Sequence, residues 1–409
     1  MNTATAARPP VFVRGPILWY VHHDGTGHWR RALAVVGQLS RDVVLMSSAQ
    51  PPGLLPENAR FLPLPPDFPA SAEPAERADA GGALRWAPPH HRGLLTRNSA
   101  ILAQAARIQP SLAVVDGSVE VTALLRTSGV PVIAVRLPGD RSDAAHQLGF
   151  DLADEVVMPV PARWGLHSGL ARTVSVGLVS ALPQTPSAEA VPADGPVVVL
   201  AGRGNRRLDL AECARIAAEV PERRVRVLGL DRSPELLAHP GLPDQPSPTG
   251  PAGPTGWGPN LDFAGRTVDP SAALAAASVV VTNGGLGAIA DVVRAGRPLV
   301  VLPEDRPFGE QHATAAALAT GGGAVVLTEA PAAGGWRTVI ETAVAAGPPR
   351  LSANGARNFA NRVERRARAE DALRPIVTER RQAPMQLERR GEPVANHPPV
   401  NVTVTARPA

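Results

Sequence analysis

The sequence has 409 residues, of which 44% are hydrophobic and 19% charged. A single hydrophobic core stops growing at about 250–300 residues, so two domains are the expectation. The formal net charge is only +4, and every basic residue is an arginine, which argues against a nucleic-acid partner. One cysteine, Cys213, excludes an intramolecular disulfide and fits a cytoplasmic location. No apolar run is long enough to predict an integral membrane segment.

The first half of the chain, residues 12–182, alternates short apolar runs with helical patterns. The continuous apolar runs predict buried parallel strands. They are Ile17–Val21, Val43–Met46, Leu112–Val115 and Val132–Val135. Strands that are separated by helical segments predict one parallel sheet built from βαβ units.

A proline-rich stretch, residues 183–195, predicts the linker to a second domain over residues 196–377. Strand-like runs restart there at Val197–Leu200, Val225–Leu228, Leu261–Phe263, Val279–Thr282, Leu299–Leu302 and Ala324–Leu327. Residues 243–259 predict an exposed loop, residues 353–376 a helix, and residues 378–409 a disordered tail. The predicted fold class is α/β, with two Rossmann-like βαβ domains that face each other across a cleft.

The turn after the first strand is the first candidate site, because ligands of open α/β sheets bind outside the carboxyl ends of the strands. Gly25 and Gly27 permit a tight turn and a close approach of the backbone to a donor molecule. His28 lies at the start of the next helix and is predicted to act as a general base. Asp116 ends another strand and is a candidate to orient the His28 imidazole. We expect no metal site, because the two adjacent histidines of this turn should point to opposite faces.

The second candidate site is a glycine-rich turn in the second domain. Asn283, Gly284 and Gly285 precede a helix whose first amides suit a phosphate group. Asp291 lies further along this helix and off its apolar stripe, where a carboxylate could accept hydrogen bonds from a ribose. A surface aspartate is the alternative interpretation.

Two further loops of the second domain are expected at the same cleft. Glu310 and Gln311 start a helix one βα step further on, and both would project from its first turn. Gly202, Arg203 and Gly204 follow the first strand of this domain, where an arginine would neutralise a diphosphate. A solvated turn is the alternative for that loop. Across the cleft, the acceptor side is assigned to Arg136, Asp140 and Asp143, which follow a strand of the first domain.

Taken in order, these motifs resemble those of the GT-B glycosyltransferases, and in particular the MurG-like group, glycosyltransferase family 28. The resemblance spans roughly residues 15–350 and is strongest over residues 278–323. It implies that His28 lies at the acceptor, near the transferred carbon. It also implies donor contacts for Asn283–Gly285 at the diphosphate, Asp291 at the ribose, Glu310 and Gln311 at the sugar, and Ala264, Gly265 and Arg266 at the base. The family usually has glutamate in place of Asp291, which leaves the nucleotide open.

The resulting hypothesis is a hexosyltransferase that moves a hexosyl group, for example N-acetylglucosaminyl, from a UDP- or dTDP-sugar to an acceptor hydroxyl. No Asp-x-Asp motif occurs, which argues against a metal-dependent transferase. We expect an inverting reaction that needs neither a metal nor a cofactor. The acceptor is a small molecule, a glycan or a lipid-linked molecule, although the first domain lacks an apolar patch for membrane docking. One alternative is a nucleotide-sugar 2-epimerase, for which Asp140 and Asp143 would supply carboxylates. A catalytically inert nucleotide-sugar-binding protein is the other.

Overall fold

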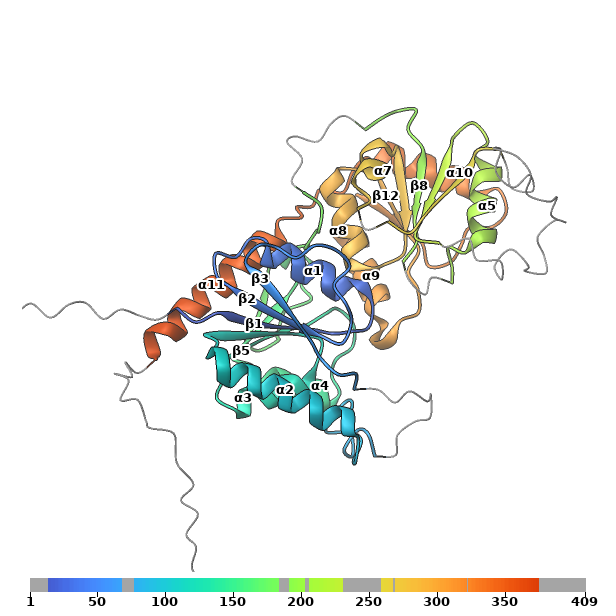
Figure 1. Cartoon of the computed structure of the whole chain (residues 1–409). Helices are drawn as coiled ribbons and strands as arrows, with labels where there is room; N and C mark the ends of the chain where they lie inside the picture. Colours follow the sequence, from blue (N-terminus) through green and yellow to red (C-terminus); the bar gives the residue numbers. More distant parts are fainter. Residues whose placement is uncertain are drawn as a thin grey trace, which may run out of the picture. The chain divides into compact units, whose positions relative to one another are not determined.

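The computed structural model describes residues 14–67, 77–183, 191–202, 206–230, 259–267, 269–321 and 323–374. Within them the chain forms two parallel sheets, each flanked by helices (Figure 1), which confirms the predicted α/β class. The predictions for the tail and for most of the linker and of the proline-rich loop lie outside the described residues. So do the predictions for Arg203 and Gly204.

The first sheet forms the centre of the N-terminal lobe. In spatial order its strands are β3 (Ala59–Pro63), β2 (Val43–Ser47), β1 (Ile17–Val21), β4 (Leu112–Asp116), β5 (Val132–Val135), β6 (Glu155–Met158) and β7 (Thr173–Ser175). The register pairs Asp116 with Val21 of β1 and with Val135 of β5. The residues that follow β1, β4 and β5 therefore lie at one edge of the sheet.

Helices cover both faces of this sheet. They are α1 (Thr26–Val36), α2 (Arg92–Ile108), α3 (Val119–Thr127), α4 (Ala144–Leu152) and α11 (Gly355–Leu373). α1 and α11 pack on one face, in a core that contains Trp19, Trp29 and Phe359. α2 and α3 pack on the other face, where Leu18 and Ile101 meet. Side chains on a strand alternate between the two faces of the sheet, and helices cover both faces. Every residue of β1 is therefore buried, and its sequence is a continuous apolar run.

The second sheet forms the centre of the C-terminal lobe. In spatial order its strands are β10 (Leu261–Gly265), β9 (Val225–Leu228), β8 (Val197–Leu200), β11 (Val279–Thr282), β12 (Leu299–Val301) and β13 (Ala324–Val326). Its helices are α5 (Leu210–Glu219), α7 (Ser271–Ala276), α8 (Leu286–Ala295), α9 (Glu310–Gly321) and α10 (Gly335–Ala346). α8 follows β11 and α9 follows β12. The glycine-rich loop before α8 and the acidic loop before α9 therefore lie at the carboxyl ends of two neighbouring strands.

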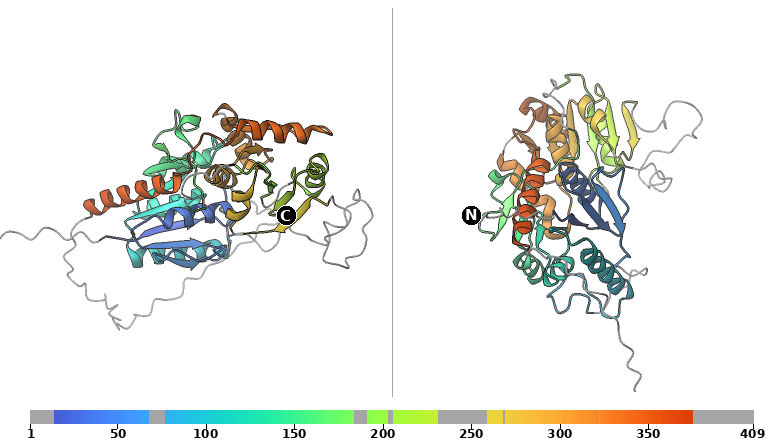
Figure 2. Two further views of the ribbon diagram at one scale, coloured as in Figure 1. Left: turned by 90° about the horizontal axis from the view of Figure 1, so that it is seen from above. Right: turned by 60° about the vertical axis from the view of Figure 1, so that its left-hand side comes forward.

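α11 does not belong to the domain that the sequence predicted for it. We expected residues 196–377 to form the second domain, but α11 packs on the N-terminal sheet and beside α1 (Figure 2). Glu364 accepts hydrogen bonds from the Ser40 amide and hydroxyl at 2.9 and 2.8 Å. Asp371 forms an ion pair with Arg41 at 2.7 Å. The end of the chain therefore completes the N-terminal lobe, because the apolar stripe of α11 matches the uncovered face of the first sheet.

None of the helices in the described part of the chain combines the length and the apolar character that a bilayer crossing requires.

Candidate active site

The loop between β1 and α1 begins the candidate active site. Gly25 is the N-terminal cap of α1 and has a φ of 78°, a left-handed conformation that favours glycine. Within the described residues no side chain caps this helix, so its first amides are available to a ligand. His28 lies in the first turn of α1, and its side chain is only 17% exposed.

His28, Asp116 and Arg31 form one charged cluster. The Nδ1 atom of His28 lies 2.7 Å from Oδ1 of Asp116, a fully buried residue at the end of β4. Arg31, one helical turn after His28, holds the same carboxylate with two bonds. Its Nε lies 2.8 Å from Oδ2 and its Nη2 2.7 Å from Oδ1. The structure thus brings together the histidine and the aspartate that the sequence could only place at separate strand ends.

The charges of this cluster define the tautomer of His28. Burial alone would raise the pKa of Asp116, but Arg31 and His28 outweigh it and hold that pKa well below its usual range. An ionised carboxylate at 2.7 Å favours a proton on Nδ1, since two acceptors at that distance would repel each other, and this contact is shorter than the 3.0 Å from Nη2 of Arg31 to the same atom. We therefore assign the Nδ1–H tautomer, which leaves the lone pair of Nε2 able to accept a proton from a hydroxyl group.

Sequence reasoning missed Arg31 as the third member of this cluster. Its only local signal is the i, i+3 spacing from His28, which places both side chains on one face of α1. Because Arg31 neutralises Asp116, the aspartate orients His28 without adding an unpaired negative charge to the site.

Two more histidines crowd the same loop. The rings of His22 and His23 stack with centroids 4.6 Å apart, and the ring of His22 lies 5.4 Å from that of His28. The prediction that His22 and His23 point to opposite faces is therefore wrong. β1 ends at Val21, so the alternation of the strand does not extend to these residues. In the part of the chain that the structure describes, no three His, Cys, Asp or Glu side chains are grouped to hold a metal ion.

His22 should make stability depend on pH. Burial is the main cause that lowers the pKa of His22 to about 4, with His28 and His23 adding to it. An unfolded histidine titrates near 6.5, so between these values the unfolded chain binds more protons than the folded one. The free energy of unfolding should therefore fall as the pH drops from about 6.5 to 4, by up to about 3 kcal/mol.

Urea denaturation at a series of pH values measures this effect. The His22→Gln variant should show a smaller loss than the wild type across the same window, because other titrating groups are common to both. If the two proteins lose stability in parallel, the assignment of the loss to His22 is wrong.

The glycine-rich turn after β11 is fastened to the start of α9. The Oε1 atom of Gln311 accepts hydrogen bonds from the amides of Gly284 at 3.0 Å and Glu304 at 2.9 Å. A Cβ at Gly284 would lie 2.8 Å from the Gln311 Cβ, so this close approach requires glycine. Gln311 is 5% exposed, and its side-chain oxygen joins two loops. The expected contact of Gln311 with a donor sugar stays a prediction.

Glu304 is a second positioning residue, which our sequence reasoning did not select. It is 3% exposed, and its carboxylate accepts the amides of Arg206 at 3.1 Å and Arg207 at 2.8 Å. These amides follow the loop that starts at Gly202, where a diphosphate contact was expected. A Cβ at Gly202 would lie 3.2 Å from the Asn283 side chain, so the loops after β8 and β11 lie side by side.

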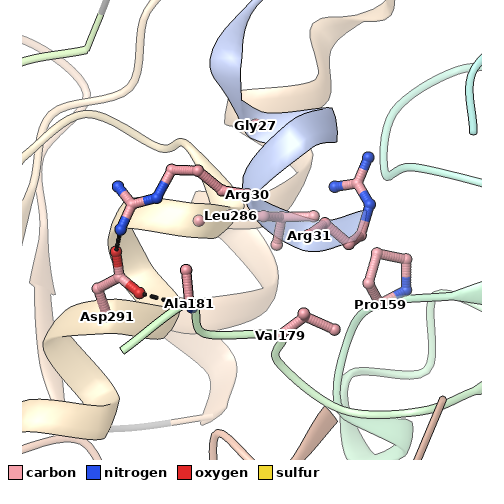
Figure 3. A pocket seen from close by; sticks show the side chains of 9 residues that line it. Gly27, Arg30, Arg31, Pro159, Val179, Ala181, Leu286 and Asp291 are labelled. Atoms are coloured by element: carbon pink, nitrogen blue, oxygen red, sulfur yellow. Dashed lines mark hydrogen bonds and ion pairs between the residues drawn. The ribbon is translucent and has the colours of Figure 1, made fainter. Parts of the chain in front are cut away.

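Asp291 is neither a surface residue nor open to a ribose. It is 1% exposed, and its Oδ2 accepts a bond from Nη2 of Arg30 at 2.6 Å (Figure 3). Its Oδ1 accepts bonds from the Ser180 hydroxyl at 2.7 Å and the Ala181 amide at 3.2 Å. Burial raises the pKa of Asp291, and Arg30 opposes that effect. Since Arg30 belongs to α1, this carboxylate links the two lobes, and a nucleotide would have to displace Arg30 to reach it.

A small pocket lies where α1 approaches α8 (Figure 3). It is lined by Gly27, Arg30, Arg31, Pro159, Val179, Ala181, Leu286, Gly287 and Asp291. Its volume of about 10 Å³ is room for one water molecule. A nucleotide sugar is far larger than this pocket.

The remaining predicted donor residues are more dispersed. Ala264 and Arg266 are exposed at the end of β10, and Gly265 between them has a φ of 70°. β10 is the edge strand, and β9 and β8 separate it from β11. Glu310 lies in the first turn of α9, and its carboxylate is 3.5 Å from Nη2 of Arg141 in the N-terminal lobe.

Two of the predicted acceptor-side residues have structural roles. Asp143 caps α4 through the His146 amide at 3.2 Å and holds the His146 ring at 2.6 Å. Asp140 accepts bonds from the amide and hydroxyl of Ser142. Both carboxylates therefore have hydrogen-bond partners within their own loop or helix. Arg136, the third predicted residue, directly follows β5 and is 9% exposed.

Comparisons with known proteins agree with this architecture. Residues 262–362 match the model of the glycosyltransferase family 28 C-terminal domain. MurG from Acinetobacter baumannii superposes with a TM-score of 0.52 at 17% identity, over 86% of this chain and 99% of that one. The spinosyn rhamnosyltransferase SpnG superposes with a TM-score of 0.55 at 17% identity, over 88% of this chain and 98% of that one. Phytolacca americana UGT2 superposes with a TM-score of 0.53 at 14% identity, over 89% of this chain and 96% of that one. No curated protein matches the chain in sequence.

Two parallel βαβ lobes with the candidate site at their carboxyl edges form the GT-B fold of these solved structures. The matched segment contains the glycine-rich turn, α8 and the start of α9, the same motifs that carried the sequence resemblance. Residues 262–362 are thus similar to the C-terminal domain of glycosyltransferase family 28, and the chain as a whole has the fold of the GT-B glycosyltransferases.

Proposed function

We propose that this glycosyltransferase moves a hexosyl group from a UDP- or dTDP-sugar to a hydroxyl group, with inversion and without a metal ion. The observation that carries the proposal is the His28–Asp116–Arg31 cluster at the carboxyl edge of the first sheet. Its tautomer leaves Nε2 of His28 able to deprotonate an acceptor hydroxyl as the sugar carbon is attacked. One direct displacement by that hydroxyl inverts the anomeric centre.

The donor side of the proposal rests on the loops after β8, β11 and β12. The first amides of α8 and the arginines of the β8 loop would stabilise the departing diphosphate without a metal. Glu304 and Gln311 join these loops through hydrogen bonds to their backbone amides. SpnG has been solved with thymidine diphosphate and Phytolacca americana UGT2 with UDP-2-fluoroglucose, which supports a pyrimidine nucleotide. The lone Cys213 supports a cytoplasmic location.

The test is to incubate the protein with UDP- and dTDP-hexoses, N-acetylglucosamine included, and a panel of hydroxylated acceptors. We expect acceptor-dependent release of the nucleoside diphosphate that persists in EDTA. Proton NMR coupling constants of the product should report the inverted anomer. An epimer of the intact donor, formed without acceptor, would instead identify an epimerase. Donor binding without diphosphate release under any condition would identify an inert binding protein.

A further inference from the structure

His22 and His28 present opposite tautomers of the imidazole ring in one loop. The Nδ1 atom of His22 lies 3.1 Å from the backbone nitrogen of Asp24. A backbone amide can only donate, so Nδ1 of His22 is the acceptor, and the proton of this ring lies on Nε2. In His28 the proton lies on Nδ1, beside Asp116, and Nε2 carries the lone pair. One ring therefore offers an N–H group and the other an acceptor nitrogen.

The N–H group of His22 is not used within the described part of the chain. No described residue accepts a hydrogen bond from Nε2 of this half-buried ring. Burial lowers the pKa of His22 to about 4, so the ring is neutral at pH 7 and keeps its proton on Nε2. An N–H group that loses water on ligand binding must find a partner or cost free energy. An oxygen atom of a bound ligand is the partner that this group requires.

The rings of His22 and His28 are close enough to contact one ligand atom. Their centroids are 5.4 Å apart. Both pack against Gly117, where a Cβ would lie 3.0 Å from Cε1 of His28 and 3.1 Å from Cβ of His22. The His23 ring stacks on His22 at 4.6 Å and supports its plane. Two hydrogen bonds of about 2.8 Å that share an oxygen can join nitrogens up to about 5.6 Å apart. The spacing therefore fits one oxygen atom between the two rings.

A hydroxyl group is the nucleophile that matches this pair, because it donates one hydrogen bond and accepts two. Its proton moves to Nε2 of His28 as the O–H bond breaks. One lone pair of the oxygen forms the bond to the anomeric carbon, and the bond from that carbon to the diphosphate breaks with its electron pair leaving on the diphosphate. The other lone pair accepts from Nε2–H of His22 throughout the displacement.

An uncharged amine does not match the pair. Its nitrogen has a single lone pair, which the bond to the anomeric carbon requires. No lone pair then remains for His22, whose N–H group is left without a partner in the transition state. We propose that His22 binds the reacting oxygen of the acceptor and selects a hydroxyl group over an amine. This inference deepens the proposed function and rests on it.

The first experiment tests this subsite without any transfer reaction. In protein labelled with ¹⁵N-histidine, the ring signals of His22 and His28 are identified by their loss in His22→Gln and His28→Gln. At pH 7 we expect the proton on Nε2 of His22 and on Nδ1 of His28. Phenol is then titrated, with toluene as the matched molecule that lacks the hydroxyl group. Phenol alone should give a saturable shift of the His22 Nε2–H signal. The same tautomer in both rings, or no such shift, would overturn the inference, whatever the enzyme transfers.

The second experiment compares the best hydroxylated acceptor with its analogue in which an amine replaces the reacting hydroxyl, at a pH where that amine is uncharged. His22→Phe keeps a ring to stack on His23 but removes the N–H group. Its kcat/KM should fall by about tenfold for the hydroxyl and stay unchanged for the amine. His22→Gln, which retains an N–H group, should keep most of the selectivity. His90→Phe, at an exposed histidine of the same lobe, is the matched control and should change neither value. Equal losses for both acceptors would mean that His22 only supports the loop, and would contradict the inference.

Two further measurements separate this inference from its alternatives. Melting temperatures of His22→Phe and His22→Gln show whether a loss of activity reflects a loss of folding. Uridine diphosphate affinity should be the same in the wild type and in His22→Phe, and a weaker complex in the variant would assign His22 to the donor and overturn the acceptor role. The expected tautomers and phenol shift, with no transfer to any acceptor, would leave the oxygen subsite standing and remove the proposed function instead.

Discussion

His28→Ala should lower kcat by about 10²- to 10⁴-fold, the usual contribution of a positioned general base. Nucleoside diphosphate affinity should change little, since the loops proposed to bind the donor belong to the C-terminal lobe. Steady-state kinetics on the true acceptor, together with calorimetric titration of the nucleotide, measure both quantities. His90→Ala is the matched control, because His90 is an exposed histidine of the same lobe. Wild-type turnover in His28→Ala would end the general-base assignment.

The structure explains why His28 is a better target than Asp116 for this test. Asp116 is fully buried and holds both His28 and Arg31. Removing its charge leaves the Arg31 guanidinium buried without a partner, which is strongly destabilising. A loss of activity in Asp116→Asn would therefore mix misfolding with misorientation of the imidazole. His28 is at the edge of the cluster, and its removal leaves the Arg31–Asp116 pair intact.

The second large effect concerns the pair formed by Arg30 and Asp291, whose two single variants should act in opposite directions. If Asp291 binds the ribose, Asp291→Ala should weaken nucleotide binding by about 10- to 150-fold, the value of a charged hydrogen bond. Arg30→Ala should tighten it, by about tenfold, because Arg30 no longer competes for the carboxylate. Calorimetry with uridine and thymidine diphosphates measures both changes.

A second outcome would give Asp291 a different role. If Asp291 only ties the lobes together, both variants should alter nucleotide affinity in the same direction, since each breaks the same ion pair. Arg337→Ala is the control, because it removes an exposed ion pair with Glu222 in the C-terminal lobe. Its side chain is 43% exposed, so its loss should change neither nucleotide affinity nor stability by more than about 1 kcal/mol.

Most strands that are buried on both faces were predicted from their apolar runs, whereas the edge strands β3 and β7 of the first sheet and the buried strand β6 were not. β1, β4, β8 and β11 read as continuous apolar runs because helices cover both sides of each sheet. β3 is half-exposed, and β7 has three residues of intermediate burial, so neither carries a strong apolar signal. Such strands form because a neighbouring strand offers free backbone groups, and no local pattern records this.

The amino-acid pattern was sufficient to predict two α/β lobes and the loops that follow their strands. Apolar runs, glycines and helix spacing act within about ten residues, so the turn at Gly25 and the turn at Gly284 were recognisable locally. Which polar groups contact one another became known from the three-dimensional fold. Asp116 reaches His28 and Arg31 across the first sheet, and Asp291 pairs with Arg30 from the other lobe. α11 returns to the first sheet because an uncovered apolar face remains there. Such pairings depend on where distant segments pack, and residue spacing does not encode them.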